Sequence, residues 1–229
     1  ERNRREFDAN RAAIDAYWAE LVKKAPEGDV SKITGSQIYD PAFTANLKPE
    51  RELSEAAGTR DHQGIVAWCE PFRYADAYEL AAGESPLLVC LDQVTDPHNL
   101  GAVARSAEGT GATGVIVPAH GSVRVTPAVC RASAGAVEHL PIAVVPNLAR
   151  YLADIKGPRL WAYAADSEGS GSMWDADLTG GLALVLGAEG KGVRPLVRRT
   201  CDGTVAIPLA GKVGSLNVSV AAAVLLYEA

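Results

Sequence analysis

Three loops of the sequence contain the residues best suited to do chemistry. The first loop, within "DPHNLGAVAR", contains Asn99 and leads into a helix that carries Arg105; the second, "LGAEGKGV", contains Glu189; and the third, "AGKVGSLN", contains Ser215 and leads into the helix that carries Asn217. Each loop follows a short apolar run that reads as a buried strand. Open α/β sheets bind their ligands at the carboxyl ends of parallel strands, where such polar groups gather. The sequence therefore predicts one binding site assembled from three separate segments.

The second and third loops indicate what kind of ligand this site could hold. They offer backbone amides and carbonyls with few charges, which can hydrogen-bond a flat heterocycle while apolar side chains pack on its faces. The apolar candidates are Leu186, Ile207, Leu209 and Leu216. Neither loop is a phosphate-binding loop, because both glycine-lysine pairs lack the upstream glycine and the following serine or threonine.

Each polar candidate also has a simpler, structural interpretation. Asn99 could have no role other than to cap a helix, and Arg105 could be a solvated helix residue. Glu189 could be a solvated loop acid, and Ser215 and Asn217 could cap the last helix. The residues taken one by one leave both interpretations open.

A glycine pattern after the first loop could instead suggest a dinucleotide-binding protein. Gly109, Gly111 and Gly114 form G-x-G-x-x-G. In a dinucleotide fold this pattern follows a strand and begins a helix, so that helix N-terminal amides meet the pyrophosphate. Here it ends a helical stretch and precedes the strand "GVIV", with Gly111 as a left-handed helix stop. A nicotinamide-dependent oxidoreductase is therefore disfavoured.

The elements that would position the loops alternate along the chain from residue 87 onward. The apolar runs are "LLVCLD", "GVIV", "PIAVV", "LWAYAA", "LALVLG" and "TVAIP". Helices are expected over residues 100–109, 127–134, 148–155, 195–200 and 216–228, the last of them buried because it is apolar on nearly every side. This alternation predicts an α/β fold with a parallel sheet that is covered by helices on both faces.

The pattern of charged, turn-forming and apolar residues divides the chain into an N-terminal region, residues 1–80, and the α/β domain, residues 81–229. Within the first region, residues 5–25 have apolar side chains at helical spacing, and turn-forming residues follow them. With 229 residues, of which 48% are hydrophobic, the chain is long enough to bury a substantial core.

Composition narrows the class of protein further. The longest apolar run, "VAAAVLLY", is far shorter than the roughly 18 residues that cross a bilayer, and no apolar stretch follows the charged start "ERNRREF". Neither a membrane span nor a signal peptide is expected. The four widely spaced cysteines are typical of reduced thiols in a cytoplasmic protein, and the four histidines lack metal-ligand spacing, so no metal is expected.

The charge pattern gives mixed information about a nucleic-acid partner. The net charge of −6 argues mildly against one, because neutralising phosphates requires a basic surface. The segment "KGVRPLVRR" contains Lys191, Arg194, Arg198 and Arg199 and no acid. It could contact phosphates or form a solvated helix face.

Three long segments together resemble a known family. "DPHNLGAVARSAEGTGATGVI", "LVLGAEGKGVRPLVRRTCD" and "IPLAGKVGSLNVSVAAAVLLYEA" are similar to the three ordered motifs of the SpoU/TrmH methyltransferases, which belong to the SPOUT superfamily. "DHQGIVA", at residues 61–67, further resembles the junction segment of the bacterial 23S rRNA guanosine 2′-O-methyltransferases. The resemblance covers about residues 53–229.

The resemblance implies an enzyme that methylates a ribose 2′-hydroxyl of RNA with S-adenosylmethionine as the methyl donor. It also implies a trefoil knot in the C-terminal part of the chain, a homodimer, and a guanosine of large-subunit rRNA as the target. The catalytic residues carried over by motif are Asn99, Arg105, Glu189, Ser215 and Asn217. The donor-binding residues are Leu186, Gly187, Ile207, Leu209 and Leu216.

The chemistry of methyl transfer suggests roles for these residues. The attacking oxygen must be aligned with the methyl group and must lose its proton. Arg105 is a poor base, because a guanidinium keeps its proton above about pH 12 and only donates hydrogen bonds. It is better suited to hold a neighbouring phosphate and stabilise the developing alkoxide. Glu189 could accept a proton or hold Arg105, and Asn99, Ser215 and Asn217 would orient these groups.

Two features of the sequence bear on partners. Relatives usually carry a small α/β RNA-binding domain at the N-terminus, whose alternating elements cannot be traced in residues 1–80, so this region is partial or divergent. The last helix is expected to pack on the sheet through Val218, Ala222, Leu225 and Leu226. Its other apolar residues, Val220, Ala223, Val224 and Tyr227, need another helix of the chain or a second subunit, which the resemblance favours.

Two alternative functions remain beside the leading one. The substrate could be tRNA, or the protein could be an RNA-binding relative that has lost its activity. The five intact motif residues argue against loss of activity.

Overall fold

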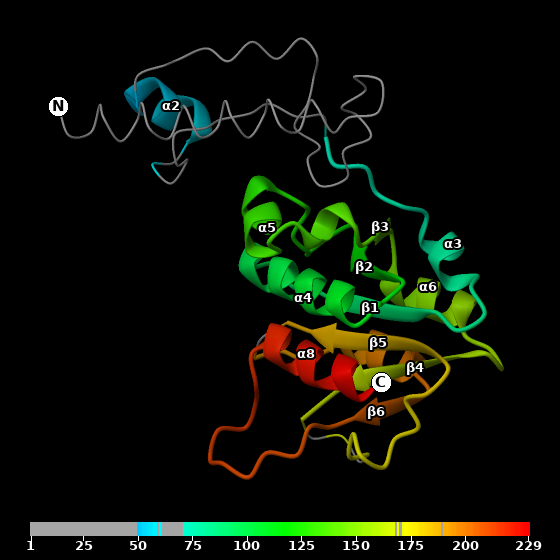
Figure 1. Cartoon of the computed structure of the whole chain (residues 1–229). Helices are drawn as coiled ribbons and strands as arrows, with labels where there is room; N and C mark the ends of the chain where they lie inside the picture. The colour runs from blue at the N-terminus through cyan, green and yellow to red at the C-terminus, as the bar shows by residue number, and fades with distance from the viewer. Residues whose placement is uncertain (1–49, 59, 61–70, 168, 170, 189) are drawn as a thin grey trace. The chain divides into compact units, whose positions relative to one another are not determined.

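The computed structural model describes residues 50–58, 60, 71–167, 169, 171–188 and 190–229 (Figure 1). The chain divides into two compact units, Glu1–Pro71 and Phe72–Ala229. In the first unit the described residues include one helix, α2 (Glu50–Ala57). The helix expected within residues 5–25 and the segment "DHQGIVA" lie outside the described residues.

The second unit is built on a six-stranded parallel sheet with the strand order β3-β2-β1-β5-β4-β6. The strands are β1 (Leu87–Asp92), β2 (Gly114–Pro118), β3 (Ile142–Val145), β4 (Leu160–Ala165), β5 (Gly181–Gly187) and β6 (Gly203–Val205). Each of the six predicted apolar runs contributes a strand. β6 ends at Val205, earlier than the run "TVAIP" predicts, because the chain there leaves the sheet to enter the wall of a cavity.

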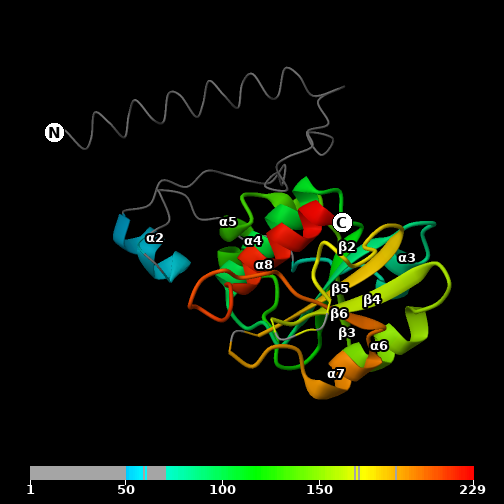
Figure 2. The same ribbon diagram turned by 90° about the horizontal axis from the view of Figure 1, so that it is seen from below.

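Helices cover both faces of the sheet, which confirms the predicted fold class (Figure 2). One face is covered by α4 (Pro97–Gly109), α5 (Pro127–Ala132) and α8 (Val218–Glu228). The other is covered by α3 (Ala77–Ala81), α6 (Leu148–Ile155) and α7 (Pro195–Thr200). In β1, Val89 and Leu91 face the first layer and Leu88 and Cys90 the second, all fully buried. Burial on both sides explains why the strands read as continuous apolar runs.

The helix ends show which residues act as caps. The side chain of Asp96 accepts a hydrogen bond of 2.8 Å from the backbone N–H of His98, and Pro97 occupies the first turn of α4. The expected start at residue 100, with Asn99 as cap, is therefore wrong: Asn99 lies inside the first turn. Asn217 does cap α8, which begins two residues later than expected. Bounds of α6 and α7 match the predicted ranges, and α5 ends two residues early.

The glycine pattern ends α4, as the sequence predicts. Gly109 is the last residue of the helix, and Gly111 has φ 75°, the left-handed conformation of a helix stop. β2 begins at Gly114. The pattern therefore leads out of a helix and into a strand, which no dinucleotide loop does.

α4 and α8 lie side by side and run in the same direction (Figure 2). Asn99 and Asn217 meet where the two helices begin, and a Cβ on Gly109 would lie 3.6 Å from the hydroxyl of Tyr227 where they end. Val218, Ala222, Leu225 and Leu226 are buried, as expected. The expectation that α8 is buried all round is wrong for the single chain, because Val220 is 48% exposed and Tyr227 is 74% exposed.

No helix among the described residues is long and apolar enough to cross a membrane. Cys90, Cys130 and Cys201 are free thiols, whereas Cys69 lies outside the described residues. Burial raises the pKa of Cys201 to about 12 and raises that of Cys90 as well. Burial therefore disfavours the reactive thiolate form of both cysteines.

The contact between α4 and α5 gives a test of this packing. A Cβ on Gly101 would lie 2.5 Å from the Cβ of Ala132 and 2.9 Å from the backbone nitrogen of Ser133. Gly101→Ala should therefore lower the free energy of unfolding by about 2 kcal/mol, as overpacking does. Gly83→Ala is the control, because its new Cβ meets nothing within 4 Å. Urea denaturation that gave both variants the same stability would contradict the packing described.

Candidate functional site

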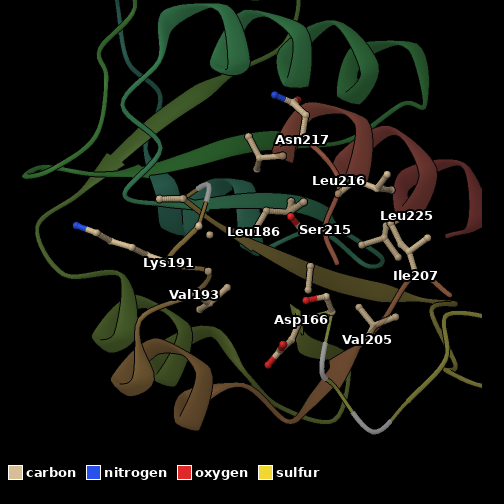
Figure 3. A pocket seen from close by; sticks show the side chains of 18 of the residues that line it. Asp166, Leu186, Lys191, Val193, Val205, Ile207, Ser215, Leu216, Asn217 and Leu225 are labelled. Carbon is tan, nitrogen blue, oxygen red and sulfur yellow. The ribbon is translucent and has the colours of Figure 1, made fainter. Parts of the chain in front are cut away.

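A cavity of about 650 Å³ opens at the carboxyl ends of β4, β5 and β6 (Figure 3). The strand ends contribute Ala165, Leu186, Gly187 and Val205 to its wall. The loop after β5 closes one side, and the chain between β6 and α8, together with the first turns of α8, closes the other. The cavity therefore lies at the second and third of the three segments from which the sequence predicts a binding site, and no residue of the first segment lines it.

All five residues expected to bind the donor line this cavity. Leu186 is fully buried, Ile207 is partly buried, and Leu209 and Leu216 are 37% and 38% exposed. Gly187 ends β5 between them in the wall. The apolar part of the wall can pack on the faces of a ring system, as the sequence analysis expects.

The glycines of the loop after β5 are required by its backbone. Gly190 and Gly192 have φ 74° and 64°, and the N–H of Gly192 donates to the carbonyl oxygen of Ala188 at 2.8 Å. The loop folds back on Gly187 so closely that a Cβ there would lie 2.0 Å from the carbonyl carbon of Gly192. Only glycine fits, so any substitution at Gly187 would displace the loop itself.

Asn99 and Asn217 join the first and third loops. The side-chain nitrogen of Asn217 donates to Oδ1 of Asn99 at 3.0 Å, and Asn99 is only 9% exposed. Oδ1 of Asn217 accepts from the backbone N–H and the hydroxyl of Ser219, at 2.8 and 2.6 Å. Asn217 and Ser215 also line the cavity, and Figure 3 shows the Asn217 side chain directed toward α4. Asn217 is thus both a cap and part of the wall.

Two predicted catalytic residues do not join this group. Arg105 is exposed, about two turns into α4, and is not among the residues that line the cavity. Glu189 lies outside the described residues. The cavity of one chain therefore contains Ser215 and Asn217, with Asn99 behind them, but not Arg105.

Two ion pairs were not anticipated from the sequence, one in the cavity wall and one next to the segment that lines it. Arg194 contacts Asp92, the last residue of β1, with NH2 2.7 Å from Oδ1. Arg198 contacts Asp166, which follows β4, with NH1 2.7 Å from Oδ2. Both arginines belong to the basic segment considered for phosphate binding, and both have a carboxylate partner instead. The available signal was an aspartate at the carboxyl end of each of two buried strands: Asp92 as the last residue of β1 and Asp166 directly after β4.

The rest of the basic segment lies along a neighbouring cavity. This second cavity is lined by Lys191 and Arg199, among others, and shares Lys191, Val193 and Arg198 with the first. Among the residues that the structure describes, no group of three histidine, cysteine, aspartate or glutamate side chains could hold a metal ion.

Comparisons with known proteins identify the family. Residues 86–227 match the sequence model of the SpoU rRNA Methylase family. The chain is 47% identical over 226 residues to the 23S rRNA (guanosine-2′-O-)-methyltransferase RlmB of Ralstonia nicotianae, covering 97% of this chain and 85% of that protein. It is 43% identical over 183 residues to RlmB of Vibrio vulnificus, covering 78% of this chain and 74% of that protein.

Solved structures agree with this result. The SpoU methyltransferase AviRb of Streptomyces viridochromogenes, in complex with the cofactor AdoMet, matches with a TM-score of 0.63 and 33% identity. The match covers 69% of this chain but only 61% of that one. An AdoMet-bound rRNA methyltransferase of Sinorhizobium meliloti matches with a TM-score of 0.62 and 28% identity.

The chain therefore belongs to the SpoU rRNA Methylase family, and its class of activity is RNA methyltransferase. The predicted family resemblance is confirmed, whereas the knot stays a prediction. The cavity fits S-adenosylmethionine, that is AdoMet: its volume lies in the range of small-ligand sites, and the glycine loop leaves backbone rather than side chains at its edge.

Leucine residues of the cavity wall allow a direct test of donor binding. Leu209→Ala should weaken binding of S-adenosylmethionine about fivefold, or about 1 kcal/mol, because apolar contact area with the ligand is lost. The protein itself should lose little stability, since Leu209 is 37% exposed. Titration calorimetry measures the affinity.

Val213→Ala is the matched control, because Val213 is 74% exposed in the same segment and is not part of the wall. Equal donor affinity in the Leu209 variant and the wild type would show that the donor binds elsewhere.

Proposed function

We propose that this protein transfers a methyl group from S-adenosylmethionine to the 2′-hydroxyl of a guanosine in 23S rRNA. The observation that carries the proposal is the cavity at the carboxyl edge of the sheet, which lies within the part of the chain that matches the family. The names of the similar RlmB proteins support the guanosine of 23S rRNA as the target. A ribosomal target also supports a cytoplasmic location.

Different residues of the chain bind the methyl donor and act on the RNA. When bound, S-adenosylmethionine supplies an electrophilic methyl group. The apolar wall and the glycine loop bind and orient it, and Ser215 and Asn217, which line the same cavity, orient the reacting groups. The hydrogen bond between Asn217 and Asn99 holds the first and third loops in a fixed relation. Preorganised groups of this kind cost no reorganisation during the reaction.

Arg105 acts on the RNA rather than on the donor. Its guanidinium holds the phosphate next to the target ribose and stabilises the alkoxide that develops as the hydroxyl attacks. Glu189 accepts the proton or fixes Arg105. Because Arg105 does not line the cavity of its own chain, we propose that it acts on RNA bound at the cavity of a second molecule.

A homodimer supplies that second molecule. Val220 and Tyr227 expose apolar surface on α8, the helix next to the one that carries Arg105. A twofold interface would cover the same patch on both partners. Arg105 of one chain would then reach the cavity of the other, and each active site would contain residues of both chains.

A tRNA substrate is the second candidate function. A solved structure concerned with the 2-OH methylation of C/U34 on tRNA matches with a TM-score of 0.57 and 28% identity, covering 64% of this chain and 95% of that one. The RlmB relatives are more similar in sequence, which favours rRNA. An inactive RNA-binding relative is the third candidate, and it would retain RNA affinity without transferring a methyl group.

Mapping of 2′-O-methylated nucleotides separates these candidates. Cells with and without the protein are compared for 2′-O-methyl groups in both rRNA and tRNA. One guanosine of 23S rRNA should lose its methyl group when the protein is removed and regain it when the protein is restored. A change confined to tRNA would replace the proposed substrate, and no change in either RNA would support the inactive relative.

Substitution of Arg105 tests its role. Arg105→Ala should reduce the rate of methyl transfer about a hundredfold, or about 2.7 kcal/mol, the scale of losing one preorganised donor. Donor affinity measured by calorimetry should stay nearly unchanged. Arg105→Lys should restore little of the lost rate of methyl transfer, because an ammonium cannot reproduce the planar fork of a guanidinium. Full activity in the alanine variant would remove Arg105 from the mechanism.

Mixing two inactive variants tests whether the site is shared. Arg105→Ala is combined with Leu209→Arg, which adds a cation to a cavity that must hold a positively charged sulfonium donor. Activity should reappear in the mixture, because one of the two sites in a mixed dimer has an intact cavity and an intact Arg105. Dimers without recovered activity would mean that each chain completes its own site.

A further inference from the structure

Asp92 and Arg194 are brought together by the fold over a separation of 102 residues. Asp92 ends β1, and its neighbour across the sheet is Gly187, the last residue of β5. Arg194 directly precedes α7 and occupies its N-cap position, where its side chain makes no capping hydrogen bond. The pair therefore connects the centre of the sheet to the point where the loop after β5 ends.

Arg194 contacts both carboxylate oxygens of Asp92. The backbone N–H of Arg194 donates to Oδ2 at 2.8 Å, and its side-chain Nε donates to Oδ1 at 2.9 Å, with NH2 2.7 Å from the same oxygen. The Asp92 side chain has no exposed surface, whereas that of Arg194 is 43% exposed. A buried carboxylate requires such partners, because an uncompensated charge in the interior is strongly unfavourable.

The segment between Gly187 and Arg194 forms one side of the cavity. It contributes Ala188, Gly190, Lys191, Gly192 and Val193 to the wall, and Figure 3 shows Lys191 and Val193 on this segment. Two of these residues are glycines with positive φ, which have no side chain to hold the loop in place. The loop is tied at its start by the contact between Ala188 and Gly192 and at its end by Arg194.

We propose that the Asp92–Arg194 pair is a positioning device that fixes this loop in the shape that binds the methyl donor. The inference rests on the proposal that the cavity holds S-adenosylmethionine. The charged pair sets the position of the Arg194 backbone, which together with the Gly192–Ala188 hydrogen bond restricts the paths by which the glycine loop can return to Gly187. Loss of the pair frees the loop, so the donor must pay for ordering it on binding.

The test is donor affinity of the folded variants. Arg194→Ala should raise the Kd of S-adenosylmethionine about tenfold by calorimetry, at a temperature well below the unfolding midpoint of every variant. At saturating donor, kcat for transfer to 23S rRNA should stay within about twofold. Arg194→Lys should raise the Kd less, about threefold, because lysine keeps a positive charge near Oδ1 of Asp92 although it lacks the planar guanidinium.

A double-mutant cycle tests whether the two residues act as a unit. Asp92→Asn keeps the size of the side chain and removes its charge. Combined with Arg194→Ala, it should raise the Kd no further than Arg194→Ala alone. A double variant whose loss of donor affinity, in free energy, equals the sum of the two single losses would contradict a shared role. Arg150→Ala is the control, since it removes an arginine paired with Asp154 on α6, away from the cavity.

The outcomes distinguish this inference from the proposed function. A pair that only stabilises the fold would lower the unfolding temperature of Arg194→Ala and leave its donor Kd at the wild-type value, which would overturn the inference alone. Failure of the wild-type protein to bind S-adenosylmethionine would overturn the proposed function as well.

Discussion

The pairing of β1 with β5 at the centre of the sheet is the constraint on which the site depends. Its register runs from Leu87 opposite Leu182 to Asp92 opposite Gly187, so both strands end at the same level. The loop that leads to Asn99 and the glycine loop that lines the cavity therefore begin side by side. β2 and β3 extend the sheet on one side, and β4 and β6 extend it on the other. The cavity follows from this order, because every carboxyl end points to the same edge.

Much of the fold could be predicted because its signals are local. Strands that are buried on both faces produce continuous apolar runs, and proline at the start of α7 marks its first residue. The wrong cap of α4 shows the limit of local signals. Asp96 and Asn99 are both good cap residues, and the proline at residue 97 was the clue that favours Asp96. The sequence indicated a side of α8, with Val220 and Tyr227, that the sheet leaves uncovered, but apolar composition does not reveal whether the same chain or a second one covers it.

The site was predictable only in part. Leu186, Ile207, Leu209 and Leu216 lie together because each belongs to the end of a strand or to the loop after it. The Asp92–Arg194 pair joins distant parts of the chain, and nothing in the spacing of the two residues relates them. The position of Arg105 away from its own cavity is likewise a property of the folded chain. The relation of residues 1–80 to an RNA-binding domain stays a prediction, although the 47% identity to RlmB of Ralstonia nicotianae extends over 97% of the chain.

The central claim is that the cavity and its three loops serve ribose methylation of 23S rRNA. Incubation of the purified protein with unmethylated 23S rRNA and S-adenosylmethionine labelled in its methyl group measures this directly, followed by nuclease digestion and mass spectrometry. The account predicts one labelled nucleoside, 2′-O-methylguanosine, and about a hundredfold less of it with Arg105→Ala. Label on a base instead of a ribose, or no transfer by a protein that binds the donor, would contradict it.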